Sequence, residues 1–238
     1  MKRLLIPLLA VTLVFSGCGT LKKLGIIPSE LEMALGLKDG LTQGLFKAFN
    51  AFSDPTGNPL VRFAFPGEAA KIERTLKDIG LDKIVERVTG KFTRAMSAAV
   101  NTAKPMFINS IKQMTIKDAV KMLVTDNLHA ATDYFKATMS PELMTAFRPI
   151  VDSAIQTEGA NKEWSSLVNI YNKIPFINKP MESNLTDFIA ARAIDGMFII
   201  IANEEAQIRN KYEFRKTDMM KKAFGYAEQE LKKRIQGK

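Results

Sequence analysis

Two arginines and two aspartates stand at spacings that could bring their charges together in a folded chain. Arg148 and Asp152 are four residues apart, and Arg192 and Asp195 are three apart, so each pair would share one face of a helix. Two interpretations stay open: a buried cluster that binds a ligand or transfers protons, and a structural network of ion pairs that orients two helices. The sequence favours the structural network, because it provides neither a nucleophile nor a metal site for these groups.

Further carboxylates fall on the helix that we predict between residues 185 and 209. Glu204 and Glu205 are adjacent there, and Glu205 stands four residues before Arg209, which is the spacing of an ion pair along a helix. Asp195 interrupts an apolar run of the same helix, where a carboxylate is costly to bury unless a cation pairs with it. A hydrolase that uses Asp195 with Glu204 or Glu205 is therefore a hypothesis, although the structural interpretation is preferred.

His129 is the single histidine of the chain. A single histidine excludes zinc sites that are built from several histidines, including the HExxH arrangement. The sequence contains no GxSxG elbow, and it lacks the phosphate-binding patterns GxxxxGK[ST] and GxGxxG. Because His129 precedes two alanines at an expected helix start, we interpret it as a surface or capping residue. We expect no metal and no other cofactor.

The N-terminal residues have the pattern of an export signal. Two basic residues precede an apolar stretch over residues 4–15, and the small residues Ser16 and Gly17 follow, where a signal peptidase cuts. Cys18 comes next and is the single cysteine of the chain. This arrangement resembles a bacterial lipobox, with Phe15 in place of the usual leucine. We predict a signal peptide over residues 1–17 and lipid attachment at Cys18.

Lipid on Cys18 would hold the mature protein at a membrane. Each methylene buried in the bilayer contributes about 0.8 kcal/mol, so several acyl chains such as palmitate on one cysteine give a stable anchor. Gly19 stands where an aspartate would resemble an inner-membrane retention signal, which favours the outer membrane and a domain that faces the periplasm. A surface-exposed orientation is the alternative. Residues 18–28 are predicted as the lipidated tether.

The net charge of +9 is concentrated near the C-terminus. Residues 207–238 carry ten Lys and Arg against four acidic residues, and we predict a basic tail over residues 226–238. Such a segment could contact anionic lipid, acidic cell-wall polymer or an envelope protein, although a solvated helix end is the preferred interpretation. Nucleic acid, the other common partner of basic segments, is not expected because the chain is exported.

The remaining pattern predicts an all-α fold, a single bundle-like domain of several helices over residues 29–225. Ser29 and Glu32 form a capping box that begins a helix in which glycines recur every fourth residue, which permits close helix packing. Between prolines, residues 60–66 alternate apolar with other side chains and predict a short extended segment. The chain is long enough for one well-buried core, and no second apolar run could span a membrane.

Helix signals dominate the chain from residue 68 onwards. Apolar residues over 85–103 recur at three- and four-residue steps, and Thr115 with Asp118 predicts a further helix start. Ser140 and Pro141 provide a cap and a first-turn proline, so a new helix is expected there. We expect the helix over residues 185–209 to be the longest and most buried.

Short motifs occur in a fixed order along this chain: AATxYF, FRPIVD, DGMF and EEAxIR. They lie in residues 123–140, 146–175 and 185–225, and residues 58–66 add a further segment. Together these segments resemble a widespread family of exported bacterial proteins that is defined only as a domain of unknown function. The resemblance covers roughly residues 30–225, with Trp164 where the family tends to have tyrosine. It implies an all-helical exported protein and assigns no catalytic residue.

These observations favour a non-enzymatic periplasmic lipoprotein that acts as a binding or scaffolding module at the outer membrane. A carrier for an apolar small molecule or lipid is one alternative, because fifteen phenylalanines and twelve methionines could line a groove for such a ligand. The carboxylate-dependent hydrolase is the other alternative.

Overall fold

A computed structural model of the chain describes residues 27–65, 69–157, 159–173 and 185–236. The predicted signal peptide, Cys18 and most of the tether lie outside these residues. The described part is all-α, as expected, and no strand occurs in it. Its helices are α1 (Glu30–Ser53), α2 (Ala69–Asp78), α3 (Asp82–Gln113), α4 (Ile116–Leu123), α5 (Ala130–Thr157), α6 (Ala160–Asn172), α7 (Thr186–Asn210) and α8 (Asp218–Gln236), with short 3-10 turns η1 (Pro55–Gly57) and η2 (Tyr212–Phe214).

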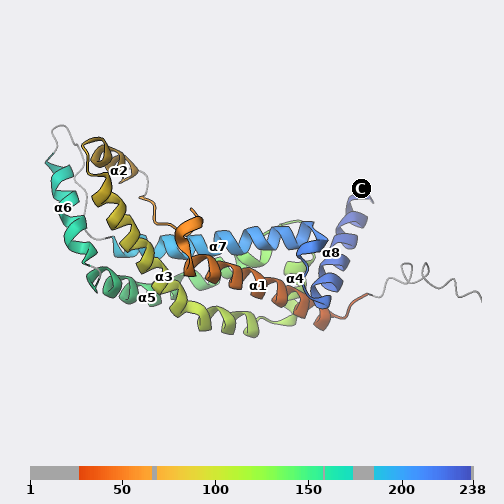
Figure 1. Cartoon of the computed structure of the whole chain (residues 1–238). Coiled ribbons are helices and arrows are strands. Elements are labelled where there is room, and N and C mark those ends of the chain that lie inside the picture. Colours follow the sequence, from red (N-terminus) through yellow and green to blue (C-terminus); the bar gives the residue numbers. More distant parts are fainter. Residues whose placement is uncertain (1–26, 66–68, 158, 174–184, 237–238) are drawn as a thin grey trace, which may run out of the picture.

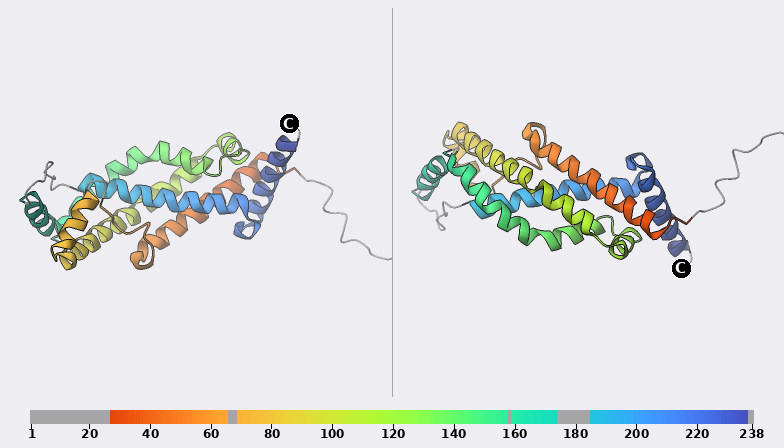
Figure 2. Two further views of the ribbon diagram at one scale, coloured as in Figure 1. Left: turned by 90° about the horizontal axis from the view of Figure 1, so that it is seen from above. Right: turned by 90° about the horizontal axis from the view of Figure 1, so that it is seen from below.

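The four long helices α1, α3, α5 and α7 pack along one another and form an elongated bundle (Figure 1). Two further views show that α2 and α6 lie at one end of this bundle (Figure 2). The opposite end contains α4, α8 and the start of α1, and α8 packs across α1 there. The bundle-like architecture predicted from the sequence is therefore confirmed.

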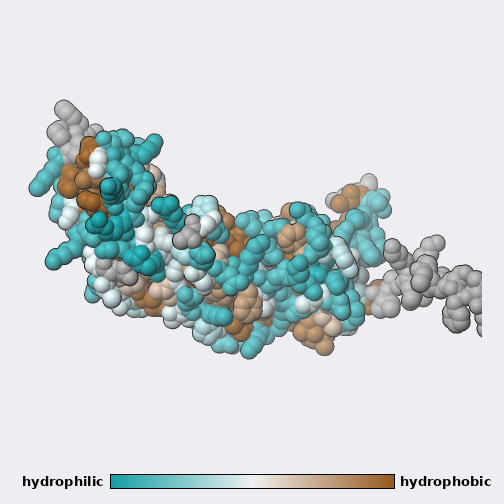
Figure 3. Space-filling model, viewed as in Figure 1, coloured by the Kyte–Doolittle hydropathy of each residue, from teal (hydrophilic) through white to brown (hydrophobic). Residues whose placement is uncertain are grey.

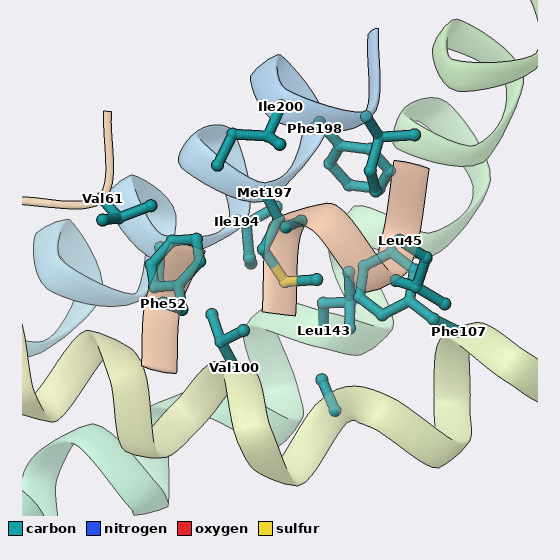
Figure 4. Packing of buried hydrophobic residues seen from close by; sticks show 14 of the residues in the cluster. Leu45, Phe52, Val61, Val100, Phe107, Leu143, Ile194, Met197, Phe198 and Ile200 are labelled. Atoms are coloured by element: carbon teal, nitrogen blue, oxygen red, sulfur yellow. The ribbon is translucent and has the colours of Figure 1, made fainter. Parts of the chain in front are cut away.

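The core lies where α1, α3, α5 and α7 face one another. Phe52 from α1, Val100 from α3 and Met197 from α7 are fully enclosed, and Leu143 from α5 completes the contact (Figure 4). Burial of each such side chain contributes about 1.5–3 kcal/mol relative to exposure, so these helices stabilise one another. None of the described helices is long and apolar enough to cross a bilayer.

The first helix begins at the capping box that the sequence predicts. The Ser29 hydroxyl accepts a hydrogen bond from the Glu32 backbone N–H, and the Glu32 carboxylate accepts one from the Ser29 N–H. The glycines of α1 then face other helices. Gly36 lies against α8 beside Ala223, and Gly44 lies against Ile201 of α7. The small residues therefore serve close helix packing within one chain.

Two expectations about helix limits were wrong. No helix begins at Pro141, because α5 runs unbroken from Ala130 to Thr157 with Pro141 and Pro149 inside it. The buried residues of α5 continue at four-residue steps across the first proline, and this packing offsets the lost backbone hydrogen bond. They are Phe135, Met139, Leu143, Phe147, Val151 and Ile155. The second wrong expectation is that the helix over residues 185–209 would be the longest: α7 has 25 residues, whereas α3 has 32.

The segment predicted as extended keeps its alternation without forming a strand in the described residues. Val61, Phe63 and Phe65 are buried, whereas residues 62 and 64 are exposed. The Phe63 N–H donates to Thr93 Oγ1 of α3 at 3.0 Å, and the Phe63 ring packs edge-to-face on Phe92. The alternating side chains thus pack on a helix instead of pairing with another strand.

The basic C-terminal residues belong to a regular helix. The boundary drawn at residues 225 and 226 falls inside α8, which continues to Gln236, and Ala227 is buried beyond that boundary. Lys222 of α8 pairs with Glu32 of α1, and Thr217 donates a hydrogen bond to Asp39 just before α8 begins. The basic segment is therefore attached to α1 at the end of the bundle where α1 starts.

Replacement of Gly36 by alanine should destabilise the contact between α1 and α8. A Cβ atom there would lie 2.5 Å from the Met219 carbonyl oxygen and would overlap the Ala223 Cβ. We expect Gly36→Ala to lower the free energy of unfolding by about 1–2 kcal/mol, measured by urea unfolding. Gly90→Ala is the matched control, because its nearest contact is Arg94 Nη1 at 3.8 Å and alanine favours helix by about 1 kcal/mol. Equal effects of both changes would contradict the close packing at Gly36.

The Glu32 carboxylate should make stability depend on acid pH. The hydrogen bond from Lys222 and those from Ser29 lower its pKa from 4.5 to about 2. Because the folded pKa lies below the unfolded one, this group stabilises the fold above pH 4.5, and the contribution is lost as the pH falls towards 2. Urea unfolding between these pH values should show a smaller loss of stability for Glu32→Gln than for the unchanged protein. Equal pH dependence of the two proteins would contradict this assignment.

Candidate functional site

The four residues of the predicted polar cluster do not converge on one another. Arg148 forms a two-point ion pair with Asp187 of α7, with Nε–Oδ1 and Nη2–Oδ2 distances of 2.7 and 3.0 Å. The hydrogen bond from Arg148 lowers the pKa of the Asp187 carboxyl, and the same bond raises the pKa of Arg148. Half or more of each side chain is exposed, so this pair lies on the surface.

The other members of the predicted cluster do not pair with one another either. Asp152 accepts hydrogen bonds from Gln156 and from Thr186, at the start of α7. Asp195 pairs with Lys136 of α5 at 2.8 Å, and its side chain is 48% exposed. The Nε atom of Arg192 is buried without a hydrogen-bond partner. The predicted pairs Arg148–Asp152 and Arg192–Asp195 do not form. The ion pairs of Arg148 and Asp195 instead link α5 to α7, as in a structural network of ion pairs that orients two helices.

A buried carboxylate lies instead near the end of α7. Glu205 is 4% exposed, and both of its oxygens accept hydrogen bonds from the start of α5. Oε1 accepts from the Ala131 N–H at 3.2 Å, and Oε2 accepts from the Thr132 N–H and hydroxyl at 2.9 and 2.7 Å. Backbone N–H groups at a helix start have no partner within the helix, and a negative charge there is favourable. Glu205 therefore caps α5 from outside that helix.

Arg209 completes this arrangement from one turn further along α7. Its Nε and Nη2 donate to Glu205 Oε1 at 3.0 and 2.7 Å, which confirms the ion pair predicted from the four-residue spacing. The same guanidinium donates to the carbonyl oxygens of Met122 and Leu123, at the end of α4. One ion pair thus joins the end of α4 and the start of α5 to α7. We call Glu205 and Arg209 the junction pair.

Two more buried charges extend the polar contacts around the junction pair. Glu204, 4% exposed, accepts hydrogen bonds from Gln43 and Lys47 of α1. Arg215, also 4% exposed, donates to the carbonyl oxygens of Ile208 and Arg209 at the end of α7. Arg215 also pairs with Glu228 of α8, whose pKa is lowered by hydrogen bonds from Lys232 and then from Arg215. These groups hold α1 and α8 against α7.

The single histidine has a structural position. The carbonyl oxygen of Ala202 lies 3.1 Å from His129 Nδ1, and a carbonyl only accepts, so this ring nitrogen carries the proton. The His129 backbone N–H donates to Asn127 Oδ1 just before α5 begins. Among the residues that the structure describes, no three His, Cys, Asp or Glu side chains are placed to share a metal ion.

The hollows of the described part differ in size and chemistry. The space between the core side chains of α1, α3, α5 and α7 measures about 10 Å³, which is barely enough for one water molecule. A mainly apolar hollow of about 520 Å³ lies between α3 and α5 and is open at the surface. A polar hollow of about 290 Å³ opens between the end of α3, the start of α4 and α5, beside Tyr134 and Glu142. A mainly apolar groove of about 160 Å³ separates α8 from the turn between α4 and α5. The core itself is therefore filled.

Sequence reasoning found the junction pair but not its partners. The spacing of Glu205 and Arg209 is local, and one turn of helix brings them together. Their contacts with α4 and α5 join residues more than seventy positions apart, which depends on how the helices pack. The EEAxIR motif contains both members of the pair, and its adjacent carboxylates in an apolar helix are the signal that could have indicated burial.

The fold and these contacts define an all-helical domain in which the buried charges of the described part connect helices to one another. A family model described as protein of unknown function (DUF4197) matches residues 28–225, and the chain belongs to this family. This membership confirms the resemblance to a family of unknown function. No curated protein and no solved structure matches the chain. The family match ends within α8, so the last turns of that helix lie beyond it.

Loss of the buried carboxylate should be far more costly than loss of a surface one. Glu205→Gln would leave Arg209 buried without a negative partner, and we expect the free energy of unfolding to fall by about 3–5 kcal/mol. Asp187→Asn is the matched control, because it also converts a carboxylate in an arginine pair to an amide, and it should change the stability little because water screens this exposed pair. Urea unfolding at neutral pH measures both, and similar losses would contradict the role of the junction pair.

Proposed function

We propose that this protein is an exported lipoprotein, anchored through Cys18, that acts as a helical binding or scaffolding module at the outer membrane. The N-terminal signal pattern and the cysteine support the anchor and the export. The observation that carries the scaffolding role is the use of buried charges in the fold. Glu204, Glu205 and Arg215 each bind groups of neighbouring helices, so these side chains stabilise the domain.

The same geometry counts against the two alternative functions. A hydrolase that uses Asp195 with Glu204 or Glu205 needs these carboxylates beside one another at a cleft. Asp195 pairs with Lys136, whereas Glu204 binds α1 and Glu205 binds α5, so the three carboxylates have separate partners. A carrier for an apolar molecule needs a cavity of a few hundred Å³ that surrounds its ligand. The space in the core measures about 10 Å³, and the larger apolar hollow of about 520 Å³ between α3 and α5 is open at the surface.

The anchor is tested by the mass and location of the protein in its native host. Intact mass should show that residues 1–17 are removed and that Cys18 carries acyl chains, and membrane fractionation should recover the protein with the outer membrane. Cys18→Ser should abolish acylation and release the protein from the membrane, because the thiol that receives the lipid is lost. Ser16→Ala is the control, since it keeps a small residue before the cysteine and should leave the membrane location unchanged.

Two outcomes would contradict this proposal. An unprocessed chain, or a mature chain with a free thiol at Cys18, would remove the anchor. A catalytic activity of the purified protein that Asp195→Asn or Glu204→Gln abolishes, with the fold intact by circular dichroism, would instead support the hydrolase.

A further inference from the structure

Large apolar side chains that remain exposed gather at the end of the bundle where α1 begins. Ile27 is 71% exposed and Leu31 is 53% exposed, and both lie at the start of α1. Leu35 follows one turn later, Ile116 starts α4, and Ile235 lies near the end of α8. Figure 3 shows hydrophobic surface over the start of α1 and the end of α8. Clustered apolar groups on a surface mark a site of interaction.

The exposed faces of α1 and α4 adjoin each other. These two helices pack together, and Lys38 Nζ donates to the Lys112 carbonyl oxygen at the end of α3. Leu35 precedes Lys38 by three residues on α1, and Ile116 starts α4 four residues after Lys112, so both residues are near this hydrogen bond along the chain. Ile27, Leu31, Leu35, Ile116, Lys117 and Lys121 together form a surface that we call the anchor-end face.

The anchor-end face also carries positive charge. Lys117 and Lys121 are one turn apart on α4, both are exposed, and neither has an ion-pair partner in the described part of the chain. Of the acidic groups on α1 and α4, Glu32 pairs with Lys222, Asp118 accepts a hydrogen bond from the Thr115 hydroxyl, and Glu30 is exposed in the first turn of α1. An apolar stripe flanked by free lysines matches a membrane surface of apolar chains and anionic headgroups.

The place of the anchor brings this face to a membrane. Cys18 precedes Ile27 by nine positions, and a fully extended chain of that length spans at most about 32 Å. The start of α1 is therefore confined near the bilayer that holds the lipid. A short link between two contacts raises the effective concentration of the second contact to the millimolar range, so a surface of low intrinsic affinity is enough to hold the domain on the bilayer.

We propose that the anchor-end face lies on the anionic surface of the membrane that holds the lipid. This inference rests on the proposed anchor at Cys18 and adds a defined orientation to it. The bundle then points away from the bilayer, and α2 and α6 form its distal end. The distal end of the module is thus presented to partners in a fixed orientation, which attachment through Cys18 alone does not provide.

A second copy of the chain is a poorer occupant of the same face. In a two-fold symmetric dimer the same surface meets itself, so Lys117 and Lys121 of one copy would approach those of the other. Like charges placed together at an interface are unfavourable, whereas the headgroups of an anionic lipid neutralise them.

The test uses acylated protein reconstituted in vesicles of phosphatidylethanolamine with phosphatidylglycerol. An environment-sensitive dye on Leu35→Cys should be quenched by brominated lipids, and the same dye on Ser153→Cys, far along α5, should not. The doubly changed Lys117→Gln, Lys121→Gln protein should lose this quenching, with roughly ten- to thirty-fold weaker contact, because each lysine near an anionic surface contributes about 1 kcal/mol. Lys83→Gln with Lys162→Gln removes the same charge at the distal end and is the control.

The outcomes separate this inference from the anchor. Intact mass of the same preparation reports acylation of Cys18; if acyl chains are absent, co-sedimentation of the unacylated protein and its lysine variants with the same vesicles tests the face directly. Equal quenching at both dye positions, equal quenching in phosphatidylcholine vesicles, or no effect of the α4 lysines would overturn the proposal. A dye response that rises with protein concentration without vesicles would assign the face to a second copy.

Discussion

The packing at one end of this bundle depends on a buried ion pair. Glu205 and Arg209 are one turn apart on α7, and between them they provide partners for the first N–H groups of α5 and the last carbonyls of α4. Groups at helix ends lack partners within their own helix, and buried ones are costly if left unpaired. The short helix α4 can therefore end, and α5 can begin, inside the protein without exposing its backbone to water.

The arrangement of the helices around the start of α1 follows from this constraint. Arg209 holds α4 by its last carbonyls, while Arg215 fixes the end of α7 and pairs with Glu228 of α8. The helices on both sides of the start of α1 are thus attached to α7 by arginines. Close contact at Gly36 then brings α8 onto α1. The anchor-end face is therefore a built part of the fold, which can hold its exposed side chains at fixed positions.

The sequence predicted features that depend on neighbours along the chain. The capping box at Ser29, the alternating burial of residues 61–65 and the Glu205–Arg209 pair all follow from local geometry. Contacts between different helices cannot be predicted from local spacing. Arg148 pairs with Asp187, which is 39 positions away, because α5 and α7 pack in one particular register. The continuous α5 has the same cause, since burial on both sides of its internal prolines outweighs the local signal to start a new helix.

The distribution of ion pairs changes how the net charge should be interpreted. Counted along the sequence, the C-terminal residues hold most of the positive excess. In the fold, Lys221, Lys232 and Lys233 pair with acidic residues of the same C-terminal segment, so these pairs leave its positive excess unchanged. Lys222 and Arg209 pair with Glu32 and Glu205, which lie outside that segment. The lysines of α4, which the overall count does not distinguish, are exposed and free of such partners in the described residues. Attraction to an anionic surface depends on the charge at the point of contact, and on the anchor-end face this charge is provided by Lys117 and Lys121 of α4.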